Sequence, residues 1–110
     1  RFLDFIDLNT GLGYFINHEL AGVVEIDQTN NKIHIQSLVV DPRFFRQGIA
    51  SKLIDFVFHS YDSNVFTVET GLDNEPATTL YKKFNFKEVK QWDTDHGIRK
   101  IRFERKIDKR

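Results

Sequence analysis

The chain has 110 residues, 40% of them apolar, and its 16 basic residues balance 16 acidic ones. This length and apolar content suit one domain, residues 1–110, around one core, and the zero net charge leaves no field that would hold a nucleic acid or an anionic membrane. The absence of cysteine excludes disulfides, cysteine nucleophiles and thiolate metal sites. Since no apolar run approaches the length of a membrane span, we expect a soluble, cytoplasmic protein.

The first part of the chain predicts the tail of a helix followed by an antiparallel meander. Phe2, Phe5 and Ile6 have helical spacing and end at a turn-like segment, residues 9–11. Short apolar runs bounded by polar turns then indicate strands. These strands are expected over residues 13–16, 21–27 and 32–40, with turns at residues 17–19 and 30–31.

The second part of the chain predicts two helices and three more strands. Apolar residues recur at helical spacing from Ile49 to Val57, so a helix is expected from there to residues 60–63. The strand that follows, residues 65–70, should lie parallel to the strand over residues 32–40, because a helix joins them. Asn74 is suited to cap a second helix, and a hairpin over residues 86–92 and 98–107 ends the fold.

The most informative segment is residues 37–51, SLVVDPRFFRQGIAS. An apolar strand runs there into a Pro turn and a basic loop, and Gly48 stands where the helix begins. A helix start offers unpaired N–H groups and partial positive charge, and Gly48 lets a phosphate approach the main chain, with Arg43 and Arg46 adding charge. The segment therefore predicts a pyrophosphate-binding loop, whereas the GxGxxG and GxxxxGK strings of other phosphate binders do not occur.

Two blocks of the chain resemble motifs A and B of the GNAT acetyltransferase superfamily. Motif A binds the pyrophosphate of acetyl-CoA in that family, and its counterpart here is Val40, Pro42 and residues 46–50, with Phe45 where the family usually has Gln or Arg. The counterpart of motif B has Asn85 where the family more often has Gly. Its matching residues are Asn74, Ala77, Leu80, Tyr81 and Phe86. The resemblance covers roughly residues 20–107.

This resemblance implies the GNAT fold, which is an α+β or α/β arrangement. Its mixed central sheet consists of an antiparallel meander and then a parallel pair at the cofactor site, and helices flank it. In the family, a first strand and two helices precede the region matched here and help to form the acceptor site. Because the chain begins with Arg1 instead of Met, we expect a GNAT domain truncated at its N-terminus that lacks this strand and these helices.

The resemblance also implies an N-acetyltransferase with acetyl-CoA as co-substrate. The acetyl group would pass directly to a primary amine of a small molecule, a peptide or a protein. The loop would hold the pyrophosphate, while the strand end would pair with the pantetheine arm and polarise the thioester. The cofactor-binding residues implied in this way are Leu38, Val39, Val40, Arg46, Gln47, Gly48, Ile49, Ala50, Ser51 and Asn74.

Tyr81 and His34 are the candidate catalytic residues. The family commonly has a Tyr at the first position, which would protonate the leaving thiolate, although packing in the core is the alternative role for Tyr81. Several family members have a Glu or His base at the position of His34, and histidine ordinarily changes its charge near neutral pH. A histidine on the sheet surface is the alternative, with Gln36 and Glu25 ordering a water.

The other polar clusters indicate no further site. Three histidines, at positions 18, 59 and 96, share no metal-ligand spacing, so no metal is expected. Seven basic residues between Arg99 and Arg110 are interpreted as the solvated face and end of the last strand, not as a nucleic-acid patch. A toxin that acetylates aminoacyl-tRNA is disfavoured by the neutral charge.

The sequence leaves the acceptor and two other functions open. Tyr14, Phe15 and Trp92 could line the acceptor site or pack in the core. A non-catalytic acyl-CoA-binding or regulatory module is suggested by Phe45 and the expected truncation, and an interaction scaffold is the third reading. The expected partners are acetyl-CoA and an amine, with no nucleic acid or membrane, and the last hairpin offers an edge through which a homodimer could form.

Overall fold

A computed structural model describes residues 5–8 and 11–107 of the chain. The chain forms two compact units, of which the first contains Arg1–Asp27 and Ile35–Asp62 and the second contains Gln28–His34 and Ser63–Arg110. Each unit has its own buried residues and its own helix. No described helix is long and apolar enough to cross a membrane.

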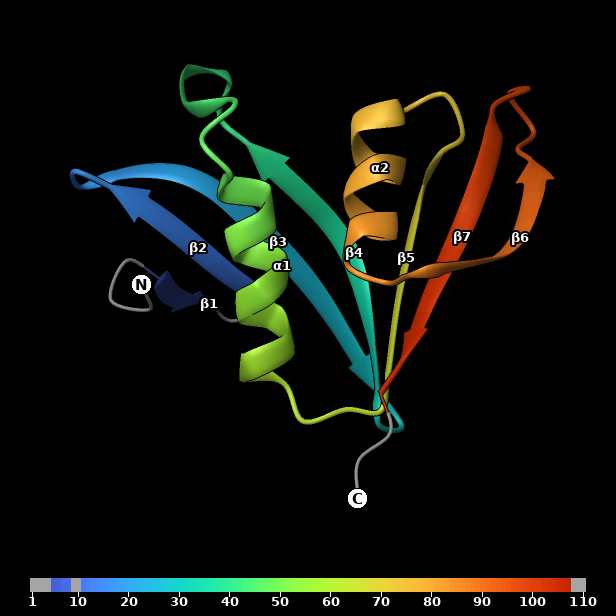
Figure 1. Ribbon diagram of the computed structural model, residues 1–110, viewed down its shortest axis with the longest axis horizontal. Coiled ribbons are helices and arrows are strands. Elements are labelled where there is room, and N and C mark those ends of the chain that lie inside the picture. The colour runs from blue at the N-terminus through green and yellow to red at the C-terminus, as the bar shows by residue number, and fades with distance from the viewer. Residues whose placement is uncertain (1–4, 9–10, 108–110) are drawn as a thin grey trace. The chain divides into compact units, whose positions relative to one another are not determined.

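The first unit is built on an antiparallel meander and one helix (Figure 1). β1 pairs with β2, and β2 with β3, through antiparallel ladders. The helix α1 packs on β2 and buries Ile49, Leu53, Ile54 and Val57, which recur at helical spacing. The elements are β1 (Phe5–Leu8), β2 (Gly11–Ile16), β3 (Glu19–Thr29), β4 (Lys32–Val40) and α1 (Ile49–Ser60). The last two residues of β3 and the first three of β4 belong to the second unit.

The predicted helical tail at the start of the chain is wrong for the residues that the structure describes. Phe5 and Ile6 lie in β1, which pairs with β2 so that Phe5 is opposite Tyr14. Phe2 lies outside the described residues. A pattern of so few apolar residues is compatible with a helix and with a strand, and the pairing with a neighbouring strand decides between them.

The first hairpin turn is one residue shorter than predicted, and the second lies at the predicted residues 30–31. Asn17 and His18 form one turn and Asn30 and Asn31 the next, all four with positive φ. Such two-residue turns match the twist of the flanking strands, and Asn tolerates the left-handed conformation that they need. β3 consequently extends by two residues beyond the predicted 21–27 at each end, whereas β4 has the predicted bounds.

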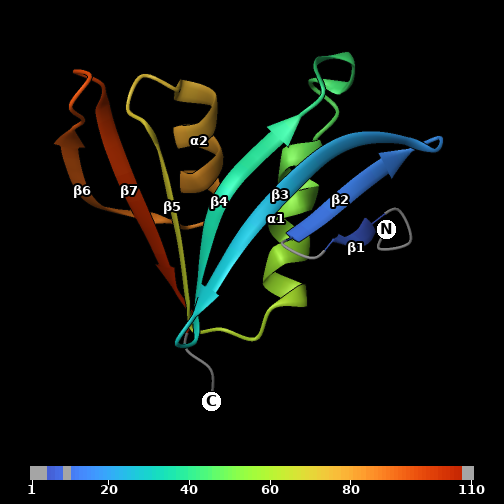
Figure 2. The ribbon, with the colours of Figure 1, turned by 180° about the vertical axis from the view of Figure 1, so that it is seen from behind.

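The second unit is a three-stranded antiparallel sheet with a helix on one face. β5 (Val65–Gly71) and β6 (Lys87–Asp93) flank β7 (Arg99–Lys106) and run antiparallel to it. Figure 2 shows these strands from the side opposite to the helix α2 (Glu75–Lys83). Val68 and Phe103 are paired across β5 and β7 and are buried. The Phe103 ring lies beside that of Tyr81 in α2, so the α2 side of the strands carries the core of this unit.

The strands follow the order β1-β2-β3-β4-β5-β7-β6 in one seven-stranded sheet. β4 and β5, the strands joined by α1, are neighbours in this order, as the expected parallel pair requires. The mixed sheet with two α-helices among the described residues confirms the predicted fold class.

Gly22 in β3 marks a close approach inside the first unit. A Cβ at this position would lie 3.0 Å from Ile49 Cγ2, 3.1 Å from Leu53 Cδ1 and 3.1 Å from the Val39 carbonyl oxygen. We expect Gly22→Ala to lower the free energy of unfolding by about 1–3 kcal/mol, because the added methyl overpacks the contact with α1. Urea unfolding monitored by circular dichroism measures this change.

Gly71 is the matched control for Gly22→Ala. It also lies in a strand, but a Cβ there would meet no atom within 4 Å. Gly71→Ala should therefore change the free energy of unfolding by less than about 0.5 kcal/mol or raise it slightly. Equal losses in the two variants would contradict the close approach at Gly22.

Candidate active site

The loop between β4 and α1 opens with a capped turn. The side chain of Asp41 accepts a hydrogen bond from the Arg43 N–H at 2.9 Å and so begins the short 3₁₀ turn Pro42–Phe44. The N–H of Asp41 donates to the carbonyl oxygen of Ala21 at 2.8 Å, which ties the end of β4 to β3. The loop therefore starts from a fixed strand end.

The rest of this loop presents the start of α1. Gly48 is the N-cap of α1 and has φ +72°, and no side chain of this residue caps the helix. A Cβ added at Gly48 would meet no atom within 4 Å. The first N–H groups of the helix have no intrahelical acceptor, and the helix dipole adds partial positive charge there. We name residues 46–51 the cradle, because this geometry can receive an anion on backbone groups.

The two arginines of the loop differ in their surroundings. The Arg43 guanidinium contacts Asp41 at 3.0 Å and Glu19 at 3.0 Å, and its hydrogen bond lowers the pKa of Asp41. The charge of Arg43 is therefore compensated by two carboxylates. Arg46 is exposed, has φ +65° and makes no ion pair with another described residue. Of the two cations predicted to serve a phosphate, Arg46 is the one whose charge is uncompensated.

A groove of 330 Å³ lies in the first unit beside the end of β4. Val39 is 60% exposed, while Leu38 and Val40 are half-buried. The lining also includes Leu20 and Gly22 of β3, which the sequence reasoning missed. A glycine inside a strand is the signal that could have indicated them, because it often marks a close approach of backbone or ligand. The remaining lining residues are Ala21, Val23, Val40, Asp41 and Pro42.

His34 is held by a buried threonine in the second unit. Its Nδ1 lies 2.7 Å from Thr67 Oγ1, and Thr67 is 3% exposed. The Thr67 hydroxyl fixes the orientation of the half-buried His34 imidazole, so Nε2 of that ring points away from Thr67. The sequence reasoning missed Thr67, although a polar residue in the apolar run VFTV was a usable signal.

Tyr81 combines a buried ring with an accessible hydroxyl. The residue is 5% exposed, and its ring packs edge-on against Phe86 at 5.7 Å and beside Phe103 at 5.9 Å, measured between centroids. Among the described residues no buried side-chain oxygen lacks a partner, and none of them hydrogen-bonds this hydroxyl, so the oxygen reaches solvent. Burial raises the pKa of Tyr81 to about 12, which keeps the phenol protonated at neutral pH.

The raised pKa of Tyr81 predicts a loss of stability in alkali. The folded protein retains this proton up to a pH near 12, whereas the unfolded chain loses it near 10. Stability therefore falls as the pH rises between these values, by up to about 2–3 kcal/mol. Urea unfolding should show this fall in the wild type, and the difference between wild type and Tyr81→Phe isolates it from other titrating groups. Parallel pH dependences of the two proteins would contradict the shift.

Asn74 caps α2 as predicted. Its side-chain oxygen accepts from the Ala77 N–H at 3.2 Å, and its amide nitrogen donates to Thr70 Oγ1 at 3.4 Å. One amide N–H and one oxygen lone pair remain on this exposed side chain. The cap leaves Asn74 able to make one further donor contact.

Each unit gathers its own share of the predicted residues. The first unit holds the strand end and the cradle, and the second holds His34, Asn74 and Tyr81. Tyr14 is 4% exposed and its hydroxyl accepts from Lys52 Nζ at 3.2 Å, so it belongs to the core. Trp92 is half-buried beneath Lys90. Within the described part of the chain, no three His, Asp or Glu side chains cluster as metal ligands.

Curated proteins with similar sequences are longer than this chain. It is 33% identical over 87 residues to the UPF0157 protein YqkA of Bacillus subtilis, an alignment that covers 78% of this chain and 25% of that protein. It is 30% identical over 96 residues to an N-alpha-acetyltransferase of Saccharolobus solfataricus, covering 81% of this chain and 57% of that protein. A streptothricin acetyltransferase of Escherichia coli is 35% identical over 78 residues, which are 67% of this chain and 45% of that protein. The chain thus spans between a quarter and somewhat over half of the length of these relatives.

Solved structures share the fold. The ribosomal-protein-S18-alanine N-acetyltransferase of Escherichia coli superposes with a TM-score of 0.82 at 17% identity, covering 97% of this chain and 72% of that one. Ard1 from Thermoplasma volcanium gives 0.81 at 20% identity, covering 91% and 72%. Residues 7–107 match the sequence model described as Acetyltransferase (GNAT) domain. The chain belongs to the GNAT acetyltransferase family.

Proposed function

We propose that this chain binds acetyl-CoA and transfers its acetyl group directly to a primary amine. The observation that carries the proposal is the cradle, where Gly48 at φ +72° leaves the start of α1 open to an anion directly after an apolar strand end. Backbone N–H groups of the cradle and the uncompensated Arg46 fit a pyrophosphate. The exposed end of β4 at Val39 suits an extended pantetheine arm.

His34 and Tyr81 would handle the protons of the reaction. When bound, acetyl-CoA supplies an activated carbonyl for the amine to attack. His34, with its ring oriented by Thr67, would accept a proton from the incoming ammonium, directly or through a water. Tyr81 would donate a hydrogen bond from its hydroxyl to the sulfur as the bond between sulfur and the acyl carbon breaks, and Val39 or Val40 would offer an N–H to the carbonyl oxygen.

The pKa of Tyr81 limits how this donation can proceed. A free thiol ordinarily has a pKa of about 8.5. A phenol with a pKa of about 12 would therefore not transfer its proton spontaneously to a fully formed, solvated thiolate. A sulfur bound beside the same apolar residues would be desolvated too, which raises its own pKa. We therefore expect Tyr81 to act by a hydrogen bond that strengthens as charge develops on sulfur.

The acceptor is proposed from the relatives. A curated relative of this chain is named N-alpha-acetyltransferase, and another is named streptothricin acetyltransferase. We favour the α-amine of a peptide, because the relative named N-alpha-acetyltransferase aligns with 81% of this chain and the streptothricin acetyltransferase with 67%. Incubation with acetyl-CoA and two peptides, one with a free α-amine and one with a blocked α-amine and a free lysine, tests this choice. Acetylation of the first alone is expected, and acetylation of the lysine alone would overturn it.

A non-catalytic acyl-CoA-binding module is the second candidate. Phe45, which is 58% exposed, stands where the family usually has a polar residue, and this observation favours it. Saturable binding of acetyl-CoA without acetylation of either peptide would select the module. Release of free CoA that depends on a peptide would select the enzyme.

His34 gives the proposed enzyme a specific pH dependence. If His34 removes the proton of the acceptor, kcat/KM should fall in acid as the imidazole becomes protonated. His34→Gln should lower kcat/KM by about 10²-fold or more at neutral pH and abolish this acid limb. Thr67→Val should keep the limb but lower kcat, because the ring loses its orienting partner. An acid limb that persists unchanged in His34→Gln would indicate that a water held by Gln36 or Glu25 relays the proton.

A further inference from the structure

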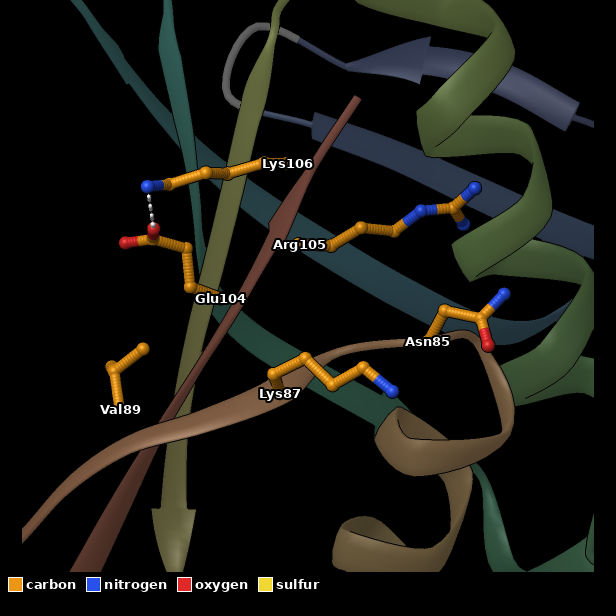
Figure 3. A pocket seen from close by; sticks show the side chains of 6 residues that line it. All are labelled: Asn85, Lys87, Val89, Glu104, Arg105 and Lys106. Atoms are coloured by element: carbon orange, nitrogen blue, oxygen red, sulfur yellow. Dashed lines mark ion pairs between the residues drawn. The ribbon is translucent and has the colours of Figure 1, made fainter. Parts of the chain in front are cut away.

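A pocket of 540 Å³ lies in the second unit at the edge of β7, and none of the residues assigned to catalysis lines it. β6 begins at Lys87 opposite Glu104, whereas β7 continues to Lys106 opposite Val65 of β5. The last residues of β7 therefore have a paired strand on one side only, within the part of the chain that the structure describes. The pocket occupies the other side, and its lining is Asn85, Lys87, Val89, Glu104, Arg105 and Lys106 (Figure 3).

The backbone of Lys106 faces this pocket. Ile107 N–H donates to the Asn64 carbonyl at 2.7 Å, and the Arg99 carbonyl accepts from Leu72 N–H at 2.9 Å, so the odd-numbered residues of β7 turn their backbone groups toward β5. Alternate residues of an antiparallel strand turn them to the opposite side. Lys106 therefore directs its N–H and C=O to the edge where β6 has not yet begun, and no described strand pairs with them there.

The pocket carries more positive than negative side chains. Glu104 pairs with Lys106 at 3.6 Å, and Arg105 donates to the Phe84 carbonyl at 3.1 Å, which fixes its guanidinium beside the end of α2. Lys87 makes no ion pair with another described residue. In Figure 3, Arg105, Asn85 and Lys87 lie on one side of β7 and Glu104 and Lys106 on the other. The open strand edge thus has cationic groups on both faces.

We propose that this pocket binds an extended peptide segment with carboxylate side chains, which adds to β7 as a short strand. The N–H and C=O of Lys106 would exchange two hydrogen bonds with the peptide backbone. Side chains of an extended peptide alternate between faces, so carboxylates at alternate positions would meet Arg105 and Lys87 on one face. Val89, which is 50% exposed, would contact an apolar residue of the peptide.

Charge and geometry favour such a peptide over other anions. A nucleic acid binds mainly through the phosphates that Lys and Arg side chains neutralise, and Glu104 both pairs with Lys106 and would repel a phosphate here. A small anion would use Lys87 or Arg105 but would leave the Lys106 backbone without a partner. This inference is independent of the proposed acetyl transfer, because it uses none of the cradle residues or His34, Asn74 and Tyr81.

The test is a titration of the full chain with a fluorescent, capped hexapeptide in which Glu and Val alternate, followed by anisotropy. We expect saturable binding that weakens at least tenfold between low and high salt, at least tenfold in Lys87→Glu, and at least tenfold when the peptide amides are N-methylated. Lys82→Gln, which removes an exposed lysine on α2 outside the pocket, should bind as the wild type does. The amide of Lys106 should become protected from hydrogen exchange.

Several results would overturn the proposal. A peptide with Gln in place of Glu that binds equally well would remove the role of charge. Equal affinity of the N-methylated peptide, or complete displacement of the acidic peptide by millimolar acetate or inorganic phosphate, would reduce the pocket to an anion site. Absence of binding at millimolar peptide would remove it altogether.

Discussion

Tyr81→Phe should lower kcat by about 100-fold while the affinity for acetyl-CoA changes less than about twofold. The substitution removes only the hydroxyl, and the ring keeps its packing against Phe86 and Phe103. The lost hydrogen bond forms as charge develops on the departing sulfur, so its absence is felt in the transition state and not in the bound ground state. Steady-state release of CoA, measured with a thiol-reactive dye, gives kcat, and calorimetry gives the affinity.

Tyr14→Phe is the matched control for this prediction. Tyr14 is also a buried tyrosine, but its hydroxyl is engaged with Lys52 in the first unit. The control should reduce stability slightly and leave kcat within about twofold, since one surface-linked hydrogen bond is worth about 1 kcal/mol. An unchanged kcat in Tyr81→Phe would remove Tyr81 from the mechanism and leave it a core residue. Equal losses in both variants would point to a general effect on folding.

Gly48→Ala should weaken acetyl-CoA binding by about 100-fold, equivalent to about 2.7 kcal/mol, or roughly two charge-assisted hydrogen bonds. The added Cβ enters space that is open in the protein and that the pyrophosphate would occupy. At φ +72° an alanine also costs about 1–2 kcal/mol of stability. The stabilisation of the fold by saturating acetyl-CoA, read from the shift in Tm, measures the loss of affinity.

Gly97→Ala separates the two effects of that substitution. Gly97 has φ +77° and likewise no atom within 4 Å of an added Cβ, but it lies in the turn between β6 and β7. The two alanine variants should lose similar stability, and only Gly48→Ala should lose the ligand-induced shift in Tm. A full shift in Gly48→Ala would refute the cradle.

The sequence was sufficient for those elements whose local signals and tertiary pairing agree. β4 has its predicted bounds, and Asn74 caps α2 because a cap is encoded within three residues. The prediction of a helical tail at Phe5 and Ile6 failed because so short a segment shows no clear period, and the pairing with β2 makes it a strand. The turns at Asn17 and Asn30 were predicted at the right positions, but the first was predicted one residue too long, since positive φ is a property of the folded hairpin.

The candidate site was predictable where backbone conformation creates it and hidden where distant residues do. Gly48 could be found because a glycine at a helix start after a strand is a local pattern. Thr67 lies 33 residues from His34, and the ion pair of Arg43 with Glu19 joins the loop after β4 to the start of β3, so neither contact has a local signature. The open edge at Lys106 depends on where β6 begins relative to β7, which no pattern within one strand records.

The most direct test of the account is a calorimetric titration of the intact chain with acetyl-CoA. The cradle predicts saturable binding with one site per chain and an affinity in the micromolar range or tighter. CoA should compete for this site. The 3′,5′-ADP portion of CoA should compete only weakly, because it lacks the pyrophosphate and pantetheine contacts. A flat titration at millimolar acetyl-CoA would contradict the account, and 3′,5′-ADP binding as tightly as CoA would place recognition outside the cradle.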